Sequence, residues 1–158
     1  MRALYDSKSK LDDRGIKALL SETEKYRTWL KVEAALALAQ AEEGFIPREA
    51  AEDIASVRFE DLDLEEMDRI KARLGPGFVP FVKVLVKACR GEGAKYVHYG
   101  VTTQNIQQTS QLYITNEVNR VFKSFIADIL DNLGTLAGDN ADTVMAGRTH
   151  GKHAIPIT

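Results

Sequence analysis

Two short stretches hold the side chains of this sequence that best suit chemistry on a small ligand. One reads HYGVTTQN and starts at His98, and the other reads GRTHGKH and starts at Gly147. An unperturbed imidazole has a pKa near ~6.5, so His150 in the second stretch can give or take a proton at neutral pH. Gly147 and Gly151 free the backbone around it to approach a ligand closely. The second stretch therefore predicts a proton donor or acceptor.

The first stretch has the composition of an anion-binding helix start. Thr102 or Thr103 is placed to cap a helix that begins near Gln104. The first N–H groups of a helix lack backbone partners and lie at the positive end of its dipole, so they can hold a carboxylate or phosphate. The threonine hydroxyls add donors. Two plainer interpretations remain open, because the threonine can be a simple N-cap and His98 an ordinary packed side chain.

The second stretch also has plainer interpretations. Arg148 and Lys152 can bind an anion or pair with acidic side chains, and His150 can be structural. Neither stretch has the ligand spacing of a zinc site or the glycine pattern of a phosphate-binding or dinucleotide-binding loop. Cys89, the only cysteine, lies in an apolar helical context that favours an inert thiol.

The elements that must position these stretches are helical by their periodicity. Ser21 with Glu24 forms a capping box, and Gly44 is placed to end that helix. Pro47 suits the first turn of a second helix. Asp63 caps a third, and residues 78–90 predict a fourth.

The longest predicted helix runs from about Gln104 to Leu136. Its apolar face includes a stripe of five residues, Val118, Phe122, Phe125, Ile129 and Leu136. Such a wide apolar face is typical of the centre of a helical bundle. We expect an all-α chain with no sheet, in which an extended connection follows this helix. The expected division is a small helical domain over 1–92 and the beginning of a long-helix bundle over 93–158.

The preceding short helices are too few to cover that face, so we expect the chain to be a fragment; the alternative is a complete small domain with a flexible tail. The formal net charge of −2 over 158 residues excludes the basic excess of a nucleic-acid-binding domain. No stretch has the apolar length of a membrane span or signal peptide. A single cysteine fits a reducing compartment, so we expect a cytoplasmic protein.

Taken together, the stretches YVHYGVTTQNIQQT and MAGRTHGKHAIPIT resemble the fumarase/aspartase superfamily of lyases. They are most similar to its adenylosuccinate lyase branch. The N-terminal stretch SETEKYRTWLKVEAALALAQAEEGFIP resembles the same branch. The order of the two motifs, separated by one long helix, makes the combination specific.

The resemblance implies an all-helical homotetramer that acts on a small dicarboxylate substrate without metal or organic cofactor. Such enzymes eliminate a group beside a carboxylate and usually release fumarate; in the adenylosuccinate branch they break a C–N bond. The resemblance implies that His150 is the general acid for the leaving nitrogen. It also implies that substrate is bound by His98, Thr102, Thr103, Gln104 and Thr149. A dianionic transition state needs concentrated hydrogen-bond donors, which agrees with these roles.

The sequence departs from the family pattern at several positions. The loop GSSxMPxKxN, which supplies the general-base serine, does not occur in the 158 residues, and the family builds each site from three protomers. We therefore expect the chain alone to be inactive. Pro76 and Gly77 stand about where a His-Asp pair is common, and Asn105 stands where Asp is usual. The alternative enzyme is a relative resembling 3-carboxy-cis,cis-muconate cycloisomerase, and the alternative outside enzymes is a helical interaction module.

Overall fold

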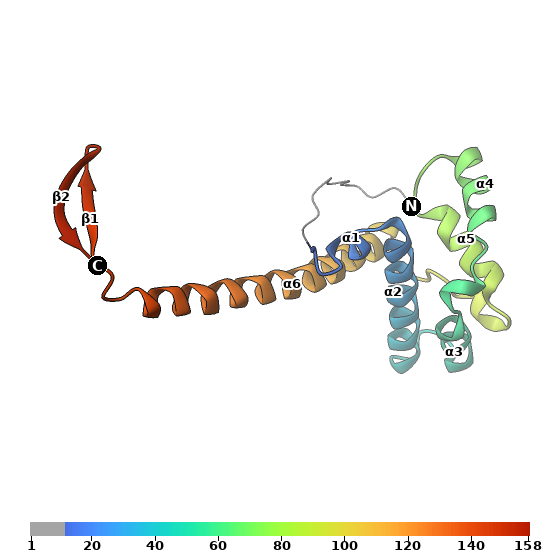
Figure 1. Cartoon of the computed structure of the whole chain (residues 1–158). Coiled ribbons are helices and arrows are strands. Elements are labelled where there is room, and N and C mark those ends of the chain that lie inside the picture. Colours follow the sequence, from blue (N-terminus) through green and yellow to red (C-terminus); the bar gives the residue numbers. More distant parts are fainter. Residues whose placement is uncertain (1–11) are drawn as a thin grey trace. The chain divides into compact units, whose positions relative to one another are not determined.

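The computed structural model describes residues 12–158, which form two compact units (Figure 1). The first unit ends at Val118, and the second comprises Asn119–Thr158. The long helix α6 (Thr103–Asp139) contributes its first part to one unit and the rest to the other. Apart from one small hairpin, the described elements are helical, which confirms the all-α fold class. The boundary expected between residues 92 and 93 stays a prediction.

The helix α2 (Glu22–Glu42) begins and ends close to the predicted positions. The Ser21 hydroxyl oxygen accepts a hydrogen bond from the Glu24 backbone N–H at 3.1 Å, as a capping residue does. Gly44 follows the helix with a φ of 77°, in the left-handed region that closes many helices. One further helical turn, α1 (Ile16–Leu19), precedes α2 and has no counterpart in the sequence prediction.

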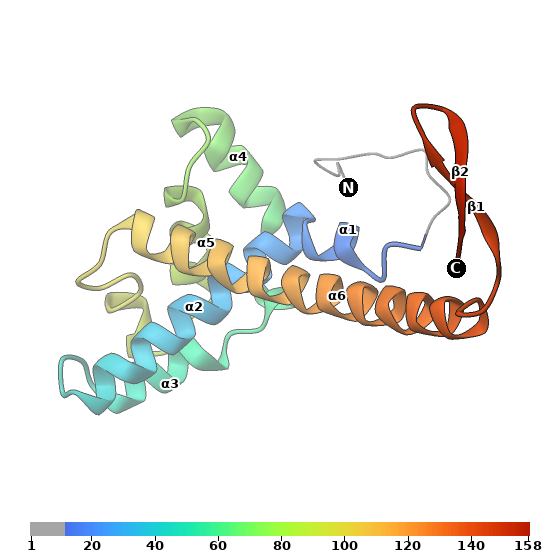
Figure 2. The same cartoon turned by 90° about the vertical axis from the view of Figure 1, so that its left-hand side faces the viewer.

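The remaining helices before α6 are short. They are α3 (Arg48–Ser56), α4 (Leu64–Leu74), α5 (Val79–Ala88) and two 3₁₀ turns, η1 (Phe59–Asp61) and η2 (Glu92–Lys95). Pro47 is the N-cap of α3, and the Asp63 carboxylate caps α4 by accepting the Glu66 backbone N–H at 2.8 Å. Helices α2 and α3 run side by side (Figures 1 and 2).

Aromatic side chains of α2 and α5 and the residue before α5 form the centre of the first unit's core. The Trp29 ring centroid lies 4.8 Å from that of Phe78 and 5.4 Å from that of Phe81. Aromatic pairs in such edge-on arrangements stabilise a core beyond the area they bury. Ile106 is buried in the same cluster. Its burial anchors the first turn of α6 and with it the predicted threonines.

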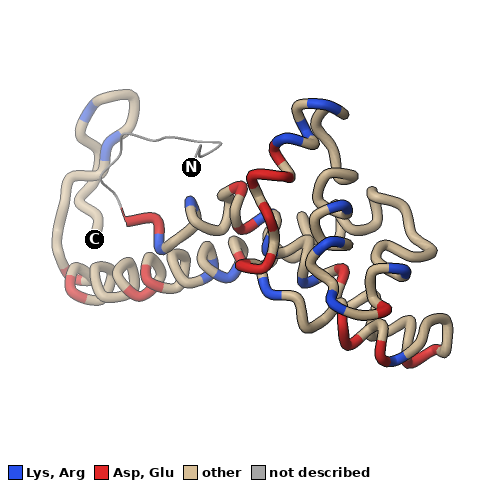
Figure 3. Tube along the Cα trace, turned by 90° about the vertical axis from the view of Figure 1, so that its right-hand side faces the viewer, with Lys and Arg blue, Asp and Glu red and all other residues tan. Residues whose placement is uncertain are grey.

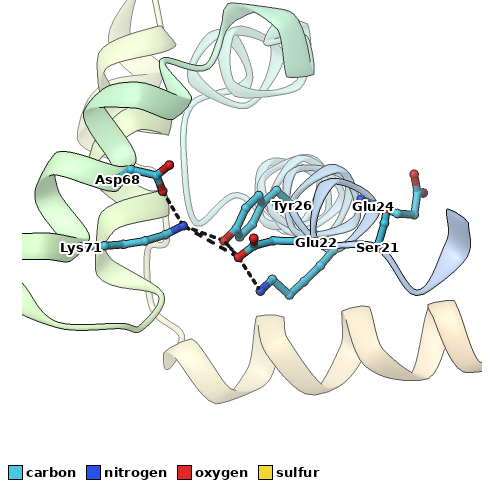
Figure 4. Close-up of polar contacts among 7 residues, drawn as sticks. Ser21, Glu22, Glu24, Tyr26, Asp68 and Lys71 are labelled. Atoms are coloured by element: carbon cyan, nitrogen blue, oxygen red, sulfur yellow. Dashed lines mark hydrogen bonds and ion pairs between the residues drawn. The ribbon is translucent and has the colours of Figure 1, made fainter. Parts of the chain in front are cut away.

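A polar network ties α2 to α4 at the edge of this core (Figure 4). The Tyr26 hydroxyl donates to the Glu22 carboxylate and accepts from the Lys71 ammonium at 2.8 Å. Lys71 also donates to Asp68 at 2.9 Å. Burial, followed by the hydrogen bond to Glu22, raises the pKa of the Tyr26 phenol. The phenol therefore stays protonated at neutral pH and continues to donate to Glu22.

The second unit corrects the prediction of an extended connection without a sheet. Strands β1 (Met145–Thr149) and β2 (Lys152–Ile157) pair as an antiparallel hairpin. The pairing runs from Met145–Ile157 to Thr149–Lys152, with an irregularity between Ala146 and Arg148. Within residues 12–158, none of the helices, α6 included, has the length and apolar character to cross a bilayer.

Candidate active site

The segment between α5 and α6 carries His98, and Asp53 of α3 fixes its beginning. The Asp53 carboxylate accepts the backbone N–H groups of Arg90, Gly91 and Gly93 at 3.0, 2.8 and 3.0 Å. Gly93 is required by this approach, because a Cβ there would lie 2.7 Å from Asp53 Oδ2 and 2.9 Å from a carbonyl oxygen of α3. These three hydrogen bonds from backbone amides to one carboxylate fix the conformation of the segment that leads to His98.

Glu33 of α2 holds His98 at two points. The imidazole Nδ1 lies 2.7 Å from Glu33 Oε1, and the His98 backbone N–H donates to Glu33 Oε2 at 3.2 Å. The Glu33 side chain is 1% exposed and that of His98 is 15% exposed. Burial raises the pKa of the Glu33 carboxyl, while the hydrogen bonds and charge of His98 act in the opposite direction. His98 is thus paired with a fully buried carboxylate and is itself partly exposed.

The surroundings of His98 restrict its ring and backbone further. Its ring centroid lies 5.1 Å from that of Phe78. Its φ is 60°, in the left-handed region that histidine enters more readily than most residues. One residue on, the Tyr99 carbonyl accepts a hydrogen bond from Gln40 of α2 at 2.8 Å. Glu33 and Gln40 are two helical turns apart, so one face of α2 binds the segment twice.

The start of α6 has the geometry of a capped helix. The Thr102 backbone N–H donates to Asn105 Oδ1 at 3.0 Å, and the Asn105 N–H donates to the Thr102 carbonyl at 3.0 Å. An aspartate, which the resemblance leads us to expect at this position, would accept the same N–H, so Asn105 preserves the cap. Within the described chain, the hydroxyls of Thr102 and Thr103 have no hydrogen-bond partner. Both hydroxyls are available to a ligand.

A cavity of about 870 Å³ lies between the start of α2 and the first turns of α6. Its lining residues are Leu19, Leu20, Ser21, Glu22, Lys25, Trp29, Gln104, Gln107, Gln108, Ser110, Gln111, Ile114 and Thr115. Gln104 is the one predicted substrate-binding residue among them. The buried Ser110 hydroxyl has no hydrogen-bond partner within residues 12–158.

His150 lies at the tip of the hairpin in the second unit. Thr149 pairs with Lys152, so His150 and Gly151 form a two-residue turn. Their φ angles are 48° and 74°, and two positive angles are what a type I′ hairpin turn requires. The His150 side chain is exposed. The turn therefore presents the imidazole at its tip.

Both glycines of the GRTHG stretch have structural roles in the hairpin. Gly151 supplies the second positive φ. At Gly147 a Cβ would lie 2.7 Å from the Ile155 carbonyl oxygen, so only glycine permits the close crossing at the irregular pair. Arg148 and Lys152 are the only charged side chains on the hairpin strands, apart from any charge on histidine (Figure 3). An anion approaching the turn meets positive charge.

The predicted residues thus fall into two groups. His98, Thr102, Thr103 and Gln104 belong to the first unit, and Thr149 and His150 to the second. A shared pocket for both groups stays a prediction. Sequence reasoning missed Glu33 and Asp53. Cys89 fits its expected inert role, because burial, with a smaller effect of Asp53, raises the pKa of its thiol to about 11.

A profile described as "Lyase" matches residues 16–158, which include both motifs. The chain belongs to the fumarase/aspartase superfamily of lyases. It is 38% identical over 140 residues to adenylosuccinate lyase of Methanocaldococcus jannaschii, a match that covers 87% of this chain and 30% of the relative.

Two solved structures are similar in fold to this chain. Fumarate lyase from Mesorhizobium sp. BNC1 has a TM-score of 0.83 and 32% identity, covering 97% of this chain and 36% of that one. The β-carboxy-cis,cis-muconate cycloisomerase of Acinetobacter calcoaceticus sp. ADP1 has a TM-score of 0.81 and 27% identity, covering 91% and 35%. The chain thus spans about a third of the length of these relatives.

Proposed function

We propose that this chain is part of a C–N lyase that cleaves an N-succinyl substrate by β-elimination and releases fumarate. The observation that carries the proposal is the presence of both motifs within a chain 38% identical to an adenylosuccinate lyase. The partners that we propose are a small dicarboxylate substrate and further copies of the chain.

The reaction assigns a distinct role to each group of residues. A base removes a proton from the carbon beside a carboxylate, the electron pair forms the C=C bond, and the C–N bond breaks. His150 gives its proton to the leaving nitrogen. The amides at the start of α6 and the hydroxyls of Thr102 and Thr103 donate to substrate carboxylates, with His98, Gln104 and Thr149 as further contacts. Such donors stabilise the negative charge of the transition state.

The base is proposed to come from the family's GSSxMPxKxN loop, which these 158 residues do not contain. We accordingly expect no turnover by the 158-residue chain alone. The activity assay therefore uses a longer protein that includes both this chain and such a loop.

The decisive variant of that protein is His150→Asn. Asparagine tolerates a positive φ and is common in type I′ turns, so the hairpin should persist while the imidazole is lost. Loss of a general acid should lower kcat by about 10²- to 10⁴-fold. Fumarate release measures kcat, and cross-strand nuclear Overhauser contacts between Thr149 and Lys152 measure the hairpin.

His150→Ala is the matched comparison, because alanine is strained at a φ of 48° and tests the turn and the imidazole together. An asparagine variant with an intact hairpin and near-normal turnover would contradict the proposed role. It would favour the helical interaction module instead.

A second candidate reaction is the lactone-forming chemistry of a carboxymuconate cycloisomerase. The likeness to the Acinetobacter enzyme favours it, as does the stretch GPGFVPF, with Pro76 and Gly77 about where adenylosuccinate lyases commonly have a His-Asp pair. Incubating the longer protein with adenylosuccinate and with 3-carboxy-cis,cis-muconate separates the two. Fumarate from the first substrate supports the lyase, and lactone from the second supports the cycloisomerase.

A further inference from the structure

We propose that Glu33 is a positioning residue, which fixes the His98 imidazole with its proton on Nδ1 so that Nε2 binds the substrate. The proposal rests on the substrate-binding role proposed for His98. It assigns a function to a buried carboxylate on α2 that lies 65 residues away in the sequence.

The contacts at Glu33 define the tautomer. An ionised carboxylate only accepts hydrogen bonds, and its two oxygens contact the two nitrogens of one residue, His98 N and Nδ1. With Glu33 ionised, Nδ1 is therefore the donor in this contact and carries a proton. Within residues 12–158, the other ring nitrogen, Nε2, has no hydrogen-bond partner. Nε2 is left to contact a ligand.

The burial of Glu33 is hard to explain by packing alone. Removing a carboxylate from water is unfavourable unless hydrogen bonds or an opposite charge compensate for it. The side chain is 1% exposed, and within residues 12–158 both hydrogen bonds of its carboxylate are to His98. The Phe78 ring centroid lies 5.1 Å from that of the His98 imidazole, and this packing limits rotation of the imidazole. A carboxylate and an aromatic ring together hold one orientation.

Glu33→Gln tests this arrangement with almost no change in shape. The His98 backbone N–H is a fixed donor, so the single amide oxygen of glutamine should turn towards it. The amide NH₂ then faces Nδ1 and donates to it, which moves the ring proton to Nε2. The expected result is a change from Nδ1 protonation to the Nε2–H tautomer.

Two-bond ¹⁵N–¹H correlations of the imidazole read the tautomer in the 158-residue chain at mildly alkaline pH. In the unaltered chain we expect the proton on Nδ1 that the contact with Glu33 implies. An Nε2–H tautomer there would overturn the proposal without any variant. So would a Glu33→Gln spectrum that keeps Nδ1 protonated. Glu42→Gln, an exposed residue on the same helix, removes the same charge and should leave the spectrum unchanged.

The functional consequence is measured in the longer protein. If Nε2 binds substrate equally in the ground and transition states, Glu33→Gln should raise KM with little change in kcat. We expect kcat/KM to fall by ~10-fold or more, as when a carboxylate that orients a histidine is lost. An altered tautomer with an unchanged KM would refute the binding role of Nε2. The tautomer measurement does not depend on enzymatic activity. Its result can therefore fail or succeed independently of the His150→Asn test of the proposed function.

Discussion

At the scale of single residues, the path of the chain into His98 depends on Asp53 and on the glycine that lies against it. The carboxylate accepts three backbone N–H groups, the last of them from Gly93. A side chain at Gly93 would meet both the carboxylate and the backbone of α3. The bound segment therefore tolerates no Cβ at this point.

Gly93→Ala should accordingly destabilise the first unit. Its Cβ would lie 2.7 Å from Asp53 Oδ2, and overpacking of this kind costs about 1–3 kcal/mol. Urea unfolding followed by Trp29 fluorescence measures the free energy. Gly77→Ala is the control, because nothing lies within 4 Å of its Cβ, and its effect should stay within ~0.5 kcal/mol. Equal urea midpoints for Gly93→Ala and Gly77→Ala would contradict this prediction. They would show that the backbone around position 93 accommodates a Cβ without loss of stability.

Glu33 shows why the sequence could not predict the whole site. By helical spacing alone, Trp29, Val32, Leu36 and Ala39 fall on one apolar face of α2, and a glutamate at position 33 is not expected in a core. In the structure Val32 and Leu36 are only partly buried, whereas Glu33 is fully buried. A buried carboxylate depends on a partner that is distant in the sequence, and periodicity carries no information about that partner. The motif singles out the histidine and the threonines as candidates, and their role stays a prediction. The carboxylate that holds the histidine has no signal in the sequence.

At the scale of elements, the α-helices after α1 followed from local signals, whereas α1 and the hairpin did not. Ser21 and Asp63 cap their helices as predicted, because a side-chain oxygen satisfies a free N–H within one turn. The hairpin turn is His150–Gly151 instead of the more familiar Asn-Gly, and β2 contains a proline. A histidine in the turn and a proline in a strand are not typical hairpin signals, so the sequence pattern did not predict the two strands. Gly151 is the one residue that favours the turn.

Gly147→Ala should disrupt the hairpin, since the new Cβ would lie 2.7 Å from the Ile155 carbonyl oxygen. We expect loss of the nuclear Overhauser contacts between Thr149 and Lys152. Gly151→Asn is the matched control, because asparagine accepts the φ of 74° and should keep those contacts. If those contacts survive Gly147→Ala, the prediction is wrong. The two strands can then move apart around position 147 without losing their pairing.

At the scale of the whole molecule, the second half of α6 exposes a row of large apolar side chains. They are Phe122, Ile126, Ile129, Leu130, Leu133 and Leu136, each more than half exposed. With 100° between successive residues, these positions fall on one side of the helix. A contiguous apolar surface of this kind favours association, in agreement with the proposed homo-oligomer.

Ile126→Glu should weaken that association, because a charge placed on the apolar row must be desolvated when copies meet. Light scattering on size-exclusion fractions measures the mass, and we expect an oligomer for the unaltered chain and a smaller species for the variant. Thr135→Glu adds the same charge on the other side of the helix and should leave the mass unchanged. A monomeric unaltered chain at high concentration would contradict the proposal.

The left-handed backbone at both histidines has an evolutionary consequence. With φ angles of 60° and 48°, positions 98 and 150 disfavour most side chains but accommodate asparagine, which a single base change can make from histidine. At position 150, where the side chain is exposed, one such mutation can therefore remove the imidazole and keep the backbone of the turn. At position 98 the same change would leave the buried Glu33 carboxylate without its imidazole partner.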